Sequence, residues 1–180
     1  MKTFDVIALG ELNVDLILNR IAGFPEVGKE IFARDMICTL GSSTAIFAAN
    51  VSALGARTAF AGMIGRDAFG ELVRGSLEAR GVDTRYVIEA ADRATGVTVV
   101  MSYGEDRANV TYPGAMEALR FADLDPEIFL SARHIHLSSL FMQPGLLADI
   151  VPILRAAHDG GATVSLDTQW DPAEEWRIDC

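Results

Sequence analysis

Short apolar runs alternate with helix-like patterns along this chain, and this alternation strongly restricts the folds open to it. Residues 4–9, 58–61 and 162–166 are mostly apolar, and each run ends in glycine or polar residues, as buried strands do. Apolar residues at helical spacing occur at 72–77 and 144–158. A strand-helix-strand rhythm predicts an α/β fold with a parallel sheet and right-handed crossovers.

Two of the expected helices carry signals at their ends. Asp67 precedes the first helical pattern, where its carboxylate can cap the opening turn. The later helix is predicted from Pro144 to His158, and Gly160–Gly161 ends it. Its apolar stripe consists of Leu147, Ile150, Val151 and Leu154. We expect this stripe to lie in the core.

Composition and charge exclude several classes of protein. Half of the 180 residues are hydrophobic, which is enough to build a core, but no apolar run is long enough to span a bilayer. The N-terminus lacks the features of a secretory signal, so a cytoplasmic location is expected. The net charge is −10 and Lys and Arg do not cluster, which argues against nucleic acid as a partner. Only Cys38 and Cys180 are present, so neither a disulfide framework nor a cysteine metal site is expected.

Residues 40–50 predict a small-residue turn that opens an amphipathic helix. Gly41 lets the backbone approach a ligand, and hydroxyls follow at Ser42, Ser43 and Thr44. The start of a helix also leaves backbone N–H groups unpaired, which suits a polyol or an anion. An ordinary N-cap on a core helix is the alternative interpretation.

Asn13 and Asp15 follow the first apolar run, at the kind of strand end where α/β folds bind ligands. If the chain stays extended, the two side chains point to the same side and offer an amide and a carboxylate to sugar hydroxyls. A polar loop without function is the alternative. Dinucleotide binding is set aside because its fingerprint needs three glycines, and Gly10 stands alone.

The segment 133–140 predicts a central strand with a polar end. His134 and His136 would share one face, but with no third ligand nearby two hydrogen-bonded structural histidines are expected, and no metal site is predicted. Ser139 and Gln143, beyond the strand end, are better candidates for a binding site.

Several motifs then occur in a characteristic order and spacing. They are Gly10-Glu11 with Asp15, the helix opening at Gly41, Leu54-Gly55-Ala56, Ile64-Gly65-Arg66-Asp67 with Gly70, and Arg80-Gly81-Val82-Asp83-Thr84. Together they resemble the PfkB, or ribokinase-like, family of carbohydrate kinases. The resemblance implies a central mostly parallel sheet with flanking helices and a small β-sheet lid, built from segments at about 16–40 and 96–112. It also implies that residues 1–180 form the N-terminal part of such a domain, which would make the chain truncated.

The resemblance also implies roles for individual residues. Asp15, with Asn13 beside it, would bind the sugar, and the family's Gly-Gly pair falls on Gly41 and Ser42. Ser43 and Ser139 are further substrate-binding candidates, and Ile46 stands where the family often has a sugar-binding Asn. Asp167 and Gln169 match a cofactor-binding segment, in which Asp171 replaces the usual Arg. ATP and Mg²⁺ are the implied cofactors, and the catalytic Asp base is expected beyond Cys180.

Three hypotheses about function follow. The first is a kinase that transfers the ATP γ-phosphoryl group to a sugar hydroxyl, of which this chain holds the substrate-binding half and the lid. The second is a non-catalytic sugar-binding module that forms a homodimer through the lid sheet. The third is an incomplete product that exposes apolar sheet edges.

Overall fold

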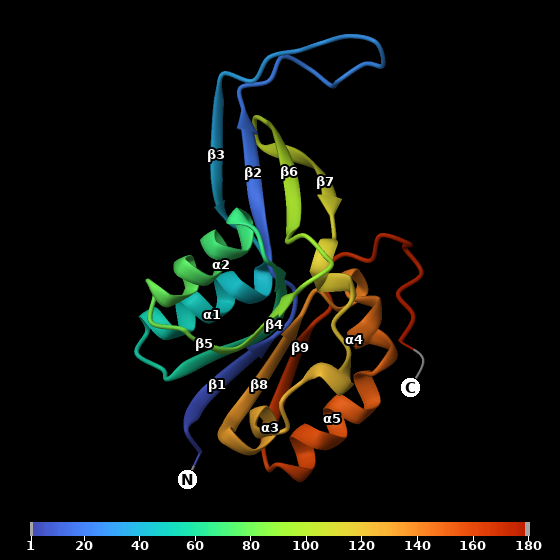
Figure 1. Ribbon diagram of the computed structural model, residues 1–180. Coiled ribbons are helices and arrows are strands. Elements are labelled where there is room, and N and C mark those ends of the chain that lie inside the picture. Colours follow the sequence, from blue (N-terminus) through green and yellow to red (C-terminus); the bar gives the residue numbers. More distant parts are fainter. Residues whose placement is uncertain (1, 179–180) are drawn as a thin grey trace.

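The computed structural model describes residues 2–178 and contains two sheets (Figure 1). Cys180, noted above, lies outside the described residues. The larger sheet has five strands in the order β5-β4-β1-β8-β9, and every neighbouring pair is parallel. Its strands are β1 (Phe4–Leu9), β4 (Thr58–Gly65), β5 (Asp83–Ala90), β8 (Ala132–Ser138) and β9 (Thr163–Asp167). The prediction of a central parallel sheet is confirmed.

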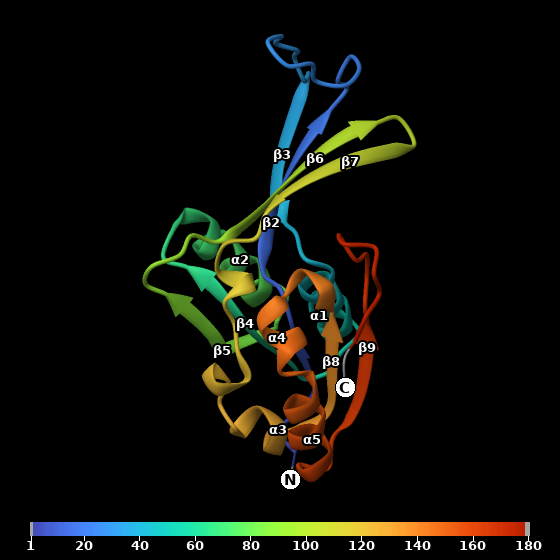
Figure 2. The same cartoon turned by 90° about the vertical axis from the view of Figure 1, so that its right-hand side faces the viewer.

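Helices cover both faces of this sheet (Figure 2). Alternate residues of β1 point to different cores: Ala8 packs with the helices α1 (Ser43–Ala53) and α2 (Ala68–Glu78). Ile7 and Leu9 pack in the core on the other face. That face carries α3 (Glu127–Ser131), α4 (Pro144–Ala148) and α5 (Ile150–Asp159), with the 3₁₀ turns η1 (Gly114–Glu117), η2 (Phe121–Asp123) and η3 (Leu140–Met142). A sheet between two helical layers is the expected solution for buried parallel strands.

The second sheet is smaller and projects from the first (Figures 1 and 2). Its order is β3-β2-β6-β7, with strands β2 (Asn13–Asn19), β3 (Asp35–Leu40), β6 (Gly96–Tyr103) and β7 (Asp106–Tyr112). β2 is antiparallel to β3 and parallel to β6, and β6 and β7 form an antiparallel hairpin. Because β2 follows β1 after only three residues, the chain passes directly from the end of the large sheet into the small one.

The helix predicted from Pro144 to His158 is wrong in one respect, because it breaks at Asp149 into α4 and α5. Pro152 has no N–H to donate to the carbonyl of residue 148, so a continuous helix would lack a hydrogen bond there. The Asp149 carboxylate instead accepts the N–H of Phe121 at 2.9 Å. The stripe also differs: Leu154 is 36% exposed, and the unpredicted Ile153 is fully buried.

The other predicted helices differ in how well they match. Asp67 caps α2 as expected, accepting the N–H of Gly70 at 2.8 Å. α1 is not clearly amphipathic. Small residues such as Ala45 and Ala48 form its buried face, while the apolar Ile46 is 46% exposed. Within residues 2–178, no helix is long and apolar enough to cross a membrane.

Candidate functional site

A pocket of about 340 Å³ lies where the large sheet, the start of α1 and the small sheet meet. It is lined by Glu11, Asn13, Asp15, Ser42, Ser43, Ile46, Thr98, Val100, Arg107, Asn109, Thr111, Ser139, Met142, Gln169 and Trp170. We call it the polar pocket. Asn13, Asp15, Ser42, Ser43 and Ser139, which the sequence predicts to bind substrate, all line it. Gly41 and Gln143 do not, although Gly41 lies close to the Asp15 carboxylate. The carboxyl ends of parallel strands are the usual place for ligand sites in α/β folds.

One wall of the polar pocket is built by β2 and β6. Asn13 donates from its Nδ2 to Asp15 Oδ1 and to Thr98 Oγ1, both at 3.0 Å, and to the carbonyl of Val14 at 3.2 Å. The extended geometry of β2 therefore brings the two side chains to the same side, as predicted. Because the Asn13 amide protons are used inside the protein, this wall faces the pocket chiefly with acceptor oxygens.

The Asp15 carboxylate is only half buried, yet its environment disfavours its charge. Burial raises the pKa of Asp15 above its ordinary value, while the Asn13 amide and the positive charge of Arg107 oppose that shift. Among the described residues, hydrogen bonds reach only its Oδ1 atom. A ligand hydroxyl that donated to Oδ2 would supply a partner to a partly desolvated acceptor, which makes Asp15 a suitable anchor.

Gly41 lets the side chains of β2 lie across the backbone at this point. A Cβ atom at Gly41 would come within 2.3 Å of Asp15 Oδ1 and 2.6 Å of Asn13 Nδ2. No real side chain tolerates such contacts, so any substitution would displace the wall. The requirement for glycine is steric and does not arise from a left-handed backbone, since Gly41 is not among the residues with positive φ.

At Ser42 the backbone conformation, and not a close contact, is what favours glycine. Its φ is 67°, a region that favours glycine, which accounts for a Gly-Gly pair at these two positions in the resembling family. The Ser42 hydroxyl donates to the carbonyl of Glu11 at 2.7 Å and accepts the N–H of Ala45 at 2.9 Å. These bonds fasten the start of α1 to the end of β1 and compensate for the unusual backbone.

The N-terminus of α1 is less open to an anion than the sequence suggests. The N–H groups of Thr44, Ala45 and Ile46 already have protein acceptors: the Glu11 carboxylate, the Ser42 hydroxyl and the Ser42 carbonyl. Glu11, which lies only 3% exposed on the pocket floor, takes the place that an anion would occupy at the helix start. Sequence reasoning placed Glu11 in a motif but gave it no role.

Ser139 completes the floor. It follows β8 with a left-handed backbone (φ 53°), and its hydroxyl donates to Glu11 Oε1 at 3.0 Å. Gln143 does not line the pocket. It lies buried, and its amide donates to the carbonyls of Ser138 and Ser139 at 2.9 and 3.2 Å, which holds the loop that presents Ser139.

The segment after β9 contributes Gln169 to the pocket but not Asp167. The Asp167 carboxylate is exposed and accepts both the backbone N–H and the side-chain amide of Gln169, at 3.0 and 2.6 Å. Asp171 is buried and accepts the N–H groups of Ala173, Glu175 and Trp176, so it organises a turn. Within residues 2–178 no cluster of three His, Cys, Asp or Glu could hold a metal ion. These residues therefore do not by themselves fit a Mg²⁺ site.

His134 and His136 share a face of β8, as predicted, and have structural roles. Both imidazoles lie 2.8 Å from Ser165 Oγ, and His136 also stacks on Phe47 with ring centroids 3.8 Å apart. Burial lowers the pKa of both rings. The neutral imidazole is the form that suits stacking and hydrogen bonding in this layer.

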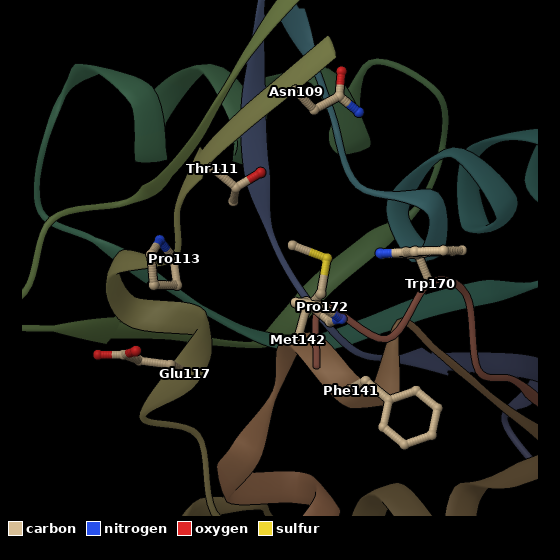
Figure 3. Close-up of a pocket in the computed structure, with 8 residues that line it drawn as sticks. All are labelled: Asn109, Thr111, Pro113, Glu117, Phe141, Met142, Trp170 and Pro172. Atoms are coloured by element: carbon tan, nitrogen blue, oxygen red, sulfur yellow. The ribbon is translucent and has the colours of Figure 1, made fainter. Parts of the chain in front are cut away.

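A second, larger cavity of about 640 Å³ adjoins the polar pocket (Figure 3). The two cavities share Asn109 and Thr111 from the small sheet, and Met142 and Trp170 from the segments that follow β8 and β9. Phe141, Pro113 and Pro172 add apolar surface, and Glu117 is the acidic residue in its lining. A ligand in the polar pocket thus has room to extend in one direction, toward an apolar and aromatic surface.

Comparisons with known proteins agree with this architecture. The family profile described as pfkB family carbohydrate kinase matches residues 3–177. Probable fructokinase-3 of Arabidopsis thaliana is 34% identical over 148 residues, covering 76% of this chain and 42% of that protein. A nucleoside kinase of Methanothermobacter thermautotrophicus is 29% identical over 136 residues, covering 75% of this chain and 44% of that protein.

Among solved structures, the fructokinase of Xylella fastidiosa with bound ATP superposes with a TM-score of 0.77 at 25% identity. The match covers 94% of this chain and 53% of the fructokinase. The chain therefore spans about half the length of the relatives it matches.

Proposed function

The chain belongs to the pfkB family of carbohydrate kinases, and from this premise we propose that the protein phosphorylates a hydroxyl of a sugar bound in the polar pocket. One observation carries the proposal: Asp15 is held by Asn13 close to Gly41, with Oδ1 bonded inside the protein and Oδ2 making no hydrogen bond to a described residue. A carboxylate and hydroxyl oxygens in the lining of one pocket are suited to a polyol, which has many protons to donate.

The small sheet would act as a lid in this reaction. Its segments at 16–40 and 96–112 carry Thr98, Asn109 and Thr111 into the lining of the polar pocket. Transfer of a phosphoryl group to a sugar competes with transfer to water, so a cover that excludes water and aligns the acceptor supplies much of the catalysis.

ATP is the expected phosphoryl donor, at the level of the family. Support comes from the structural neighbour with bound ATP, and Gln169, which matches the implied cofactor-binding segment, is part of the pocket lining. We assign no step to Asp167, because both of its oxygens already accept hydrogen bonds from Gln169. The catalytic base is not assigned to any residue of this chain, in keeping with the resemblance.

A second candidate function is a sugar-binding module that dimerises through the small sheet. The strand residues that alternate with the pocket-facing ones are apolar, and Met36, Val110 and Tyr112 are 65%, 61% and 56% exposed on this outer face. Pairing two such faces would bury apolar surface. Sedimentation of the wild type against Val110→Lys tests it: a dimer that the lysine dissociates supports this function, and a monomer at all concentrations contradicts it.

Titration calorimetry with fructose and with adenosine tests the kinase proposal at its binding step, before any turnover is required. Asp15→Ala should weaken binding of the accepted ligand by about 1–3 kcal/mol, because it removes a partly buried hydrogen-bond partner. Glu105→Ala, which changes an exposed acid of the same sheet, is the matched control and should bind normally. Unchanged affinity in Asp15→Ala would mean that the pocket is wrongly assigned. Because no residue of this chain is assigned as the base, sugar-dependent ADP release is measured on the protein as its own cell makes it, and that release distinguishes the kinase from the binding module.

A further inference from the structure

Glu11 lies at the centre of a buried cluster of hydroxyl groups that the proposed reaction does not use. Its Oε1 atom is 3.0 Å from both Ser43 Oγ and Ser139 Oγ and 3.3 Å from the backbone nitrogen of Thr44. Its Oε2 atom accepts the hydroxyl of Thr44. Every hydrogen bond made to this carboxylate within residues 2–178 comes from a hydroxyl or a backbone N–H.

This arrangement determines where the hydroxyl protons lie. Four donors converge on two carboxylate oxygens, which is the arrangement that an ionised carboxylate takes, and such a group can only accept. A serine or threonine hydroxyl has one proton. The Thr44 hydroxyl donates to Oε2. Of Ser43 and Ser139, one donates to Oε1 and the other donates either to Oε1 or to the neighbouring serine oxygen 2.8 Å away. In each of these arrangements the Ser139 proton stays within the cluster, and Ser139 has only lone pairs left for other partners.

The hydrogen-bonding capacity of Ser43 is largely used within the cluster. Its Oγ atom also lies 2.9 Å from Ser138 Oγ and 2.8 Å from Ser139 Oγ. Ser139 lines the polar pocket, and its Oγ atom keeps a lone pair that can face a ligand. Ser138 does not line the pocket and makes no hydrogen bond to Glu11 in the described part of the chain.

We propose that Glu11 is a positioning residue that fixes the polarity of the pocket floor, holding the Ser139 proton inward so that Ser139 accepts a hydrogen bond from a ligand hydroxyl. Asn13 has the same effect on the wall built by β2 and β6. Its amide protons are used inside the protein, and Asp15 faces the ligand as an acceptor. The ligand must then donate at least two hydroxyl protons, one to each side. The inference rests on the proposed sugar site and specifies the polarity with which that site binds.

Neutron diffraction from deuterium-exchanged crystals of the protein tests this directly, without any ligand. We expect the Thr44 deuteron to point at Glu11 Oε2 and the Ser139 deuteron to point at Glu11 Oε1 or at Ser43 Oγ, with no deuteron on the carboxylate itself. A Ser139 deuteron directed into the pocket, or a deuteron on Glu11, would overturn the proposal.

A variant then tests the consequence for binding, with fructose as the probe. Glu11→Gln keeps the shape but places an amide donor opposite the hydroxyl and N–H donors of the cluster, so it should weaken fructose binding at least tenfold. Ser138→Ala, which removes a hydroxyl that does not touch Glu11, is the control and should bind within a factor of about two. Normal fructose binding by Glu11→Gln would contradict the proposal.

Two other outcomes, a variant that does not fold and a wild type that does not bind fructose, are interpreted separately. If Glu11→Gln does not fold, Ser139→Ala replaces it and should show the same tenfold loss, because it removes the acceptor itself. If the wild type does not bind fructose, the choice of sugar under the proposed function is wrong, and the deuteron positions alone decide the role of Glu11.

Discussion

Replacing Gly41 by alanine tests whether the wall of the polar pocket depends on close packing at one backbone position. The new Cβ would lie 2.3 Å from Asp15 Oδ1, so that oxygen would have to move by about 1 Å to reach the ordinary contact distance of 3.4 Å. Such a movement breaks the 3.0 Å hydrogen bond from Asn13 to Asp15. We expect a loss of about 1–3 kcal/mol in the free energy of unfolding, the usual cost of overpacking.

Chemical denaturation measures this loss, and Gly75→Ala is the matched control. Gly75 lies exposed inside α2, and a Cβ atom added there would meet no other atom within 4 Å, so the same chemical change should stabilise the protein by about 0.5–1 kcal/mol. Opposite signs at the two glycines are the expected result.

A double-mutant cycle then identifies the cause of the loss. In an Asp15→Ala background the contacts with the Asp15 carboxylate are gone and the 2.6 Å contact with Asn13 Nδ2 remains, so Gly41→Ala should cost less than in the wild type but should still destabilise the protein. Equal costs in both backgrounds, or a stabilising Gly41→Ala, would refute the steric argument.

Two aspartates should give opposite dependences of stability on pH. Burial raises the pKa of Asp15, so ionisation of Asp15 destabilises the folded state as the pH rises through that pKa. Solvent screens this half-exposed group, so Asp15→Asn should raise the free energy of unfolding by only on the order of 0.5–1 kcal/mol at pH 7 and by little at low pH. The same variant should weaken sugar binding. Burial opposes ionisation of Asp67 too, but hydrogen bonds from Thr95 and Gly70 hold its pKa below the ordinary value. The contribution of ionised Asp67 to the free energy of unfolding is therefore present at neutral pH and is lost as the pH falls through the folded-state pKa. Asp67→Ala should therefore cost about 1–2 kcal/mol at pH 7 and less in acid, as measured by thermal unfolding at several pH values. The same pH slope in both variants would contradict these assignments.

The parts of the fold that sequence predicts well are those with local causes. Buried parallel strands appear as continuous apolar runs, and the alternation of side chains along an extended segment brings Asn13 and Asp15 together. The cap at Asp67 also needs only its neighbours in the chain. The break at Asp149 had a visible signal in Pro152, but the bond that stabilises it comes from Phe121, a distant residue.

The residues that sequence reasoning missed depend on contacts between distant segments. Glu11 follows a strand and looks like a loop acid, and only the return of α1 and β8 surrounds it with hydroxyls. Asp171 stands where the resembling family has an Arg, which suggests a reversed charge at a binding site, yet its carboxylate holds three backbone N–H groups of the following turn. Charge and position in a motif did not reveal these partners.

The parallel pairing of β2 with β6 has a consequence for how this molecule folds. Asn13 and Thr98, which meet across that pair, are 85 residues apart in the sequence, and the whole of α1, β4, α2 and β5 lies between them. The loop that must close is long, so the small sheet cannot form as an early local unit, whereas the β6–β7 hairpin can. The polar pocket is therefore completed only after most of the large sheet has assembled. A nascent chain gains its binding surface late.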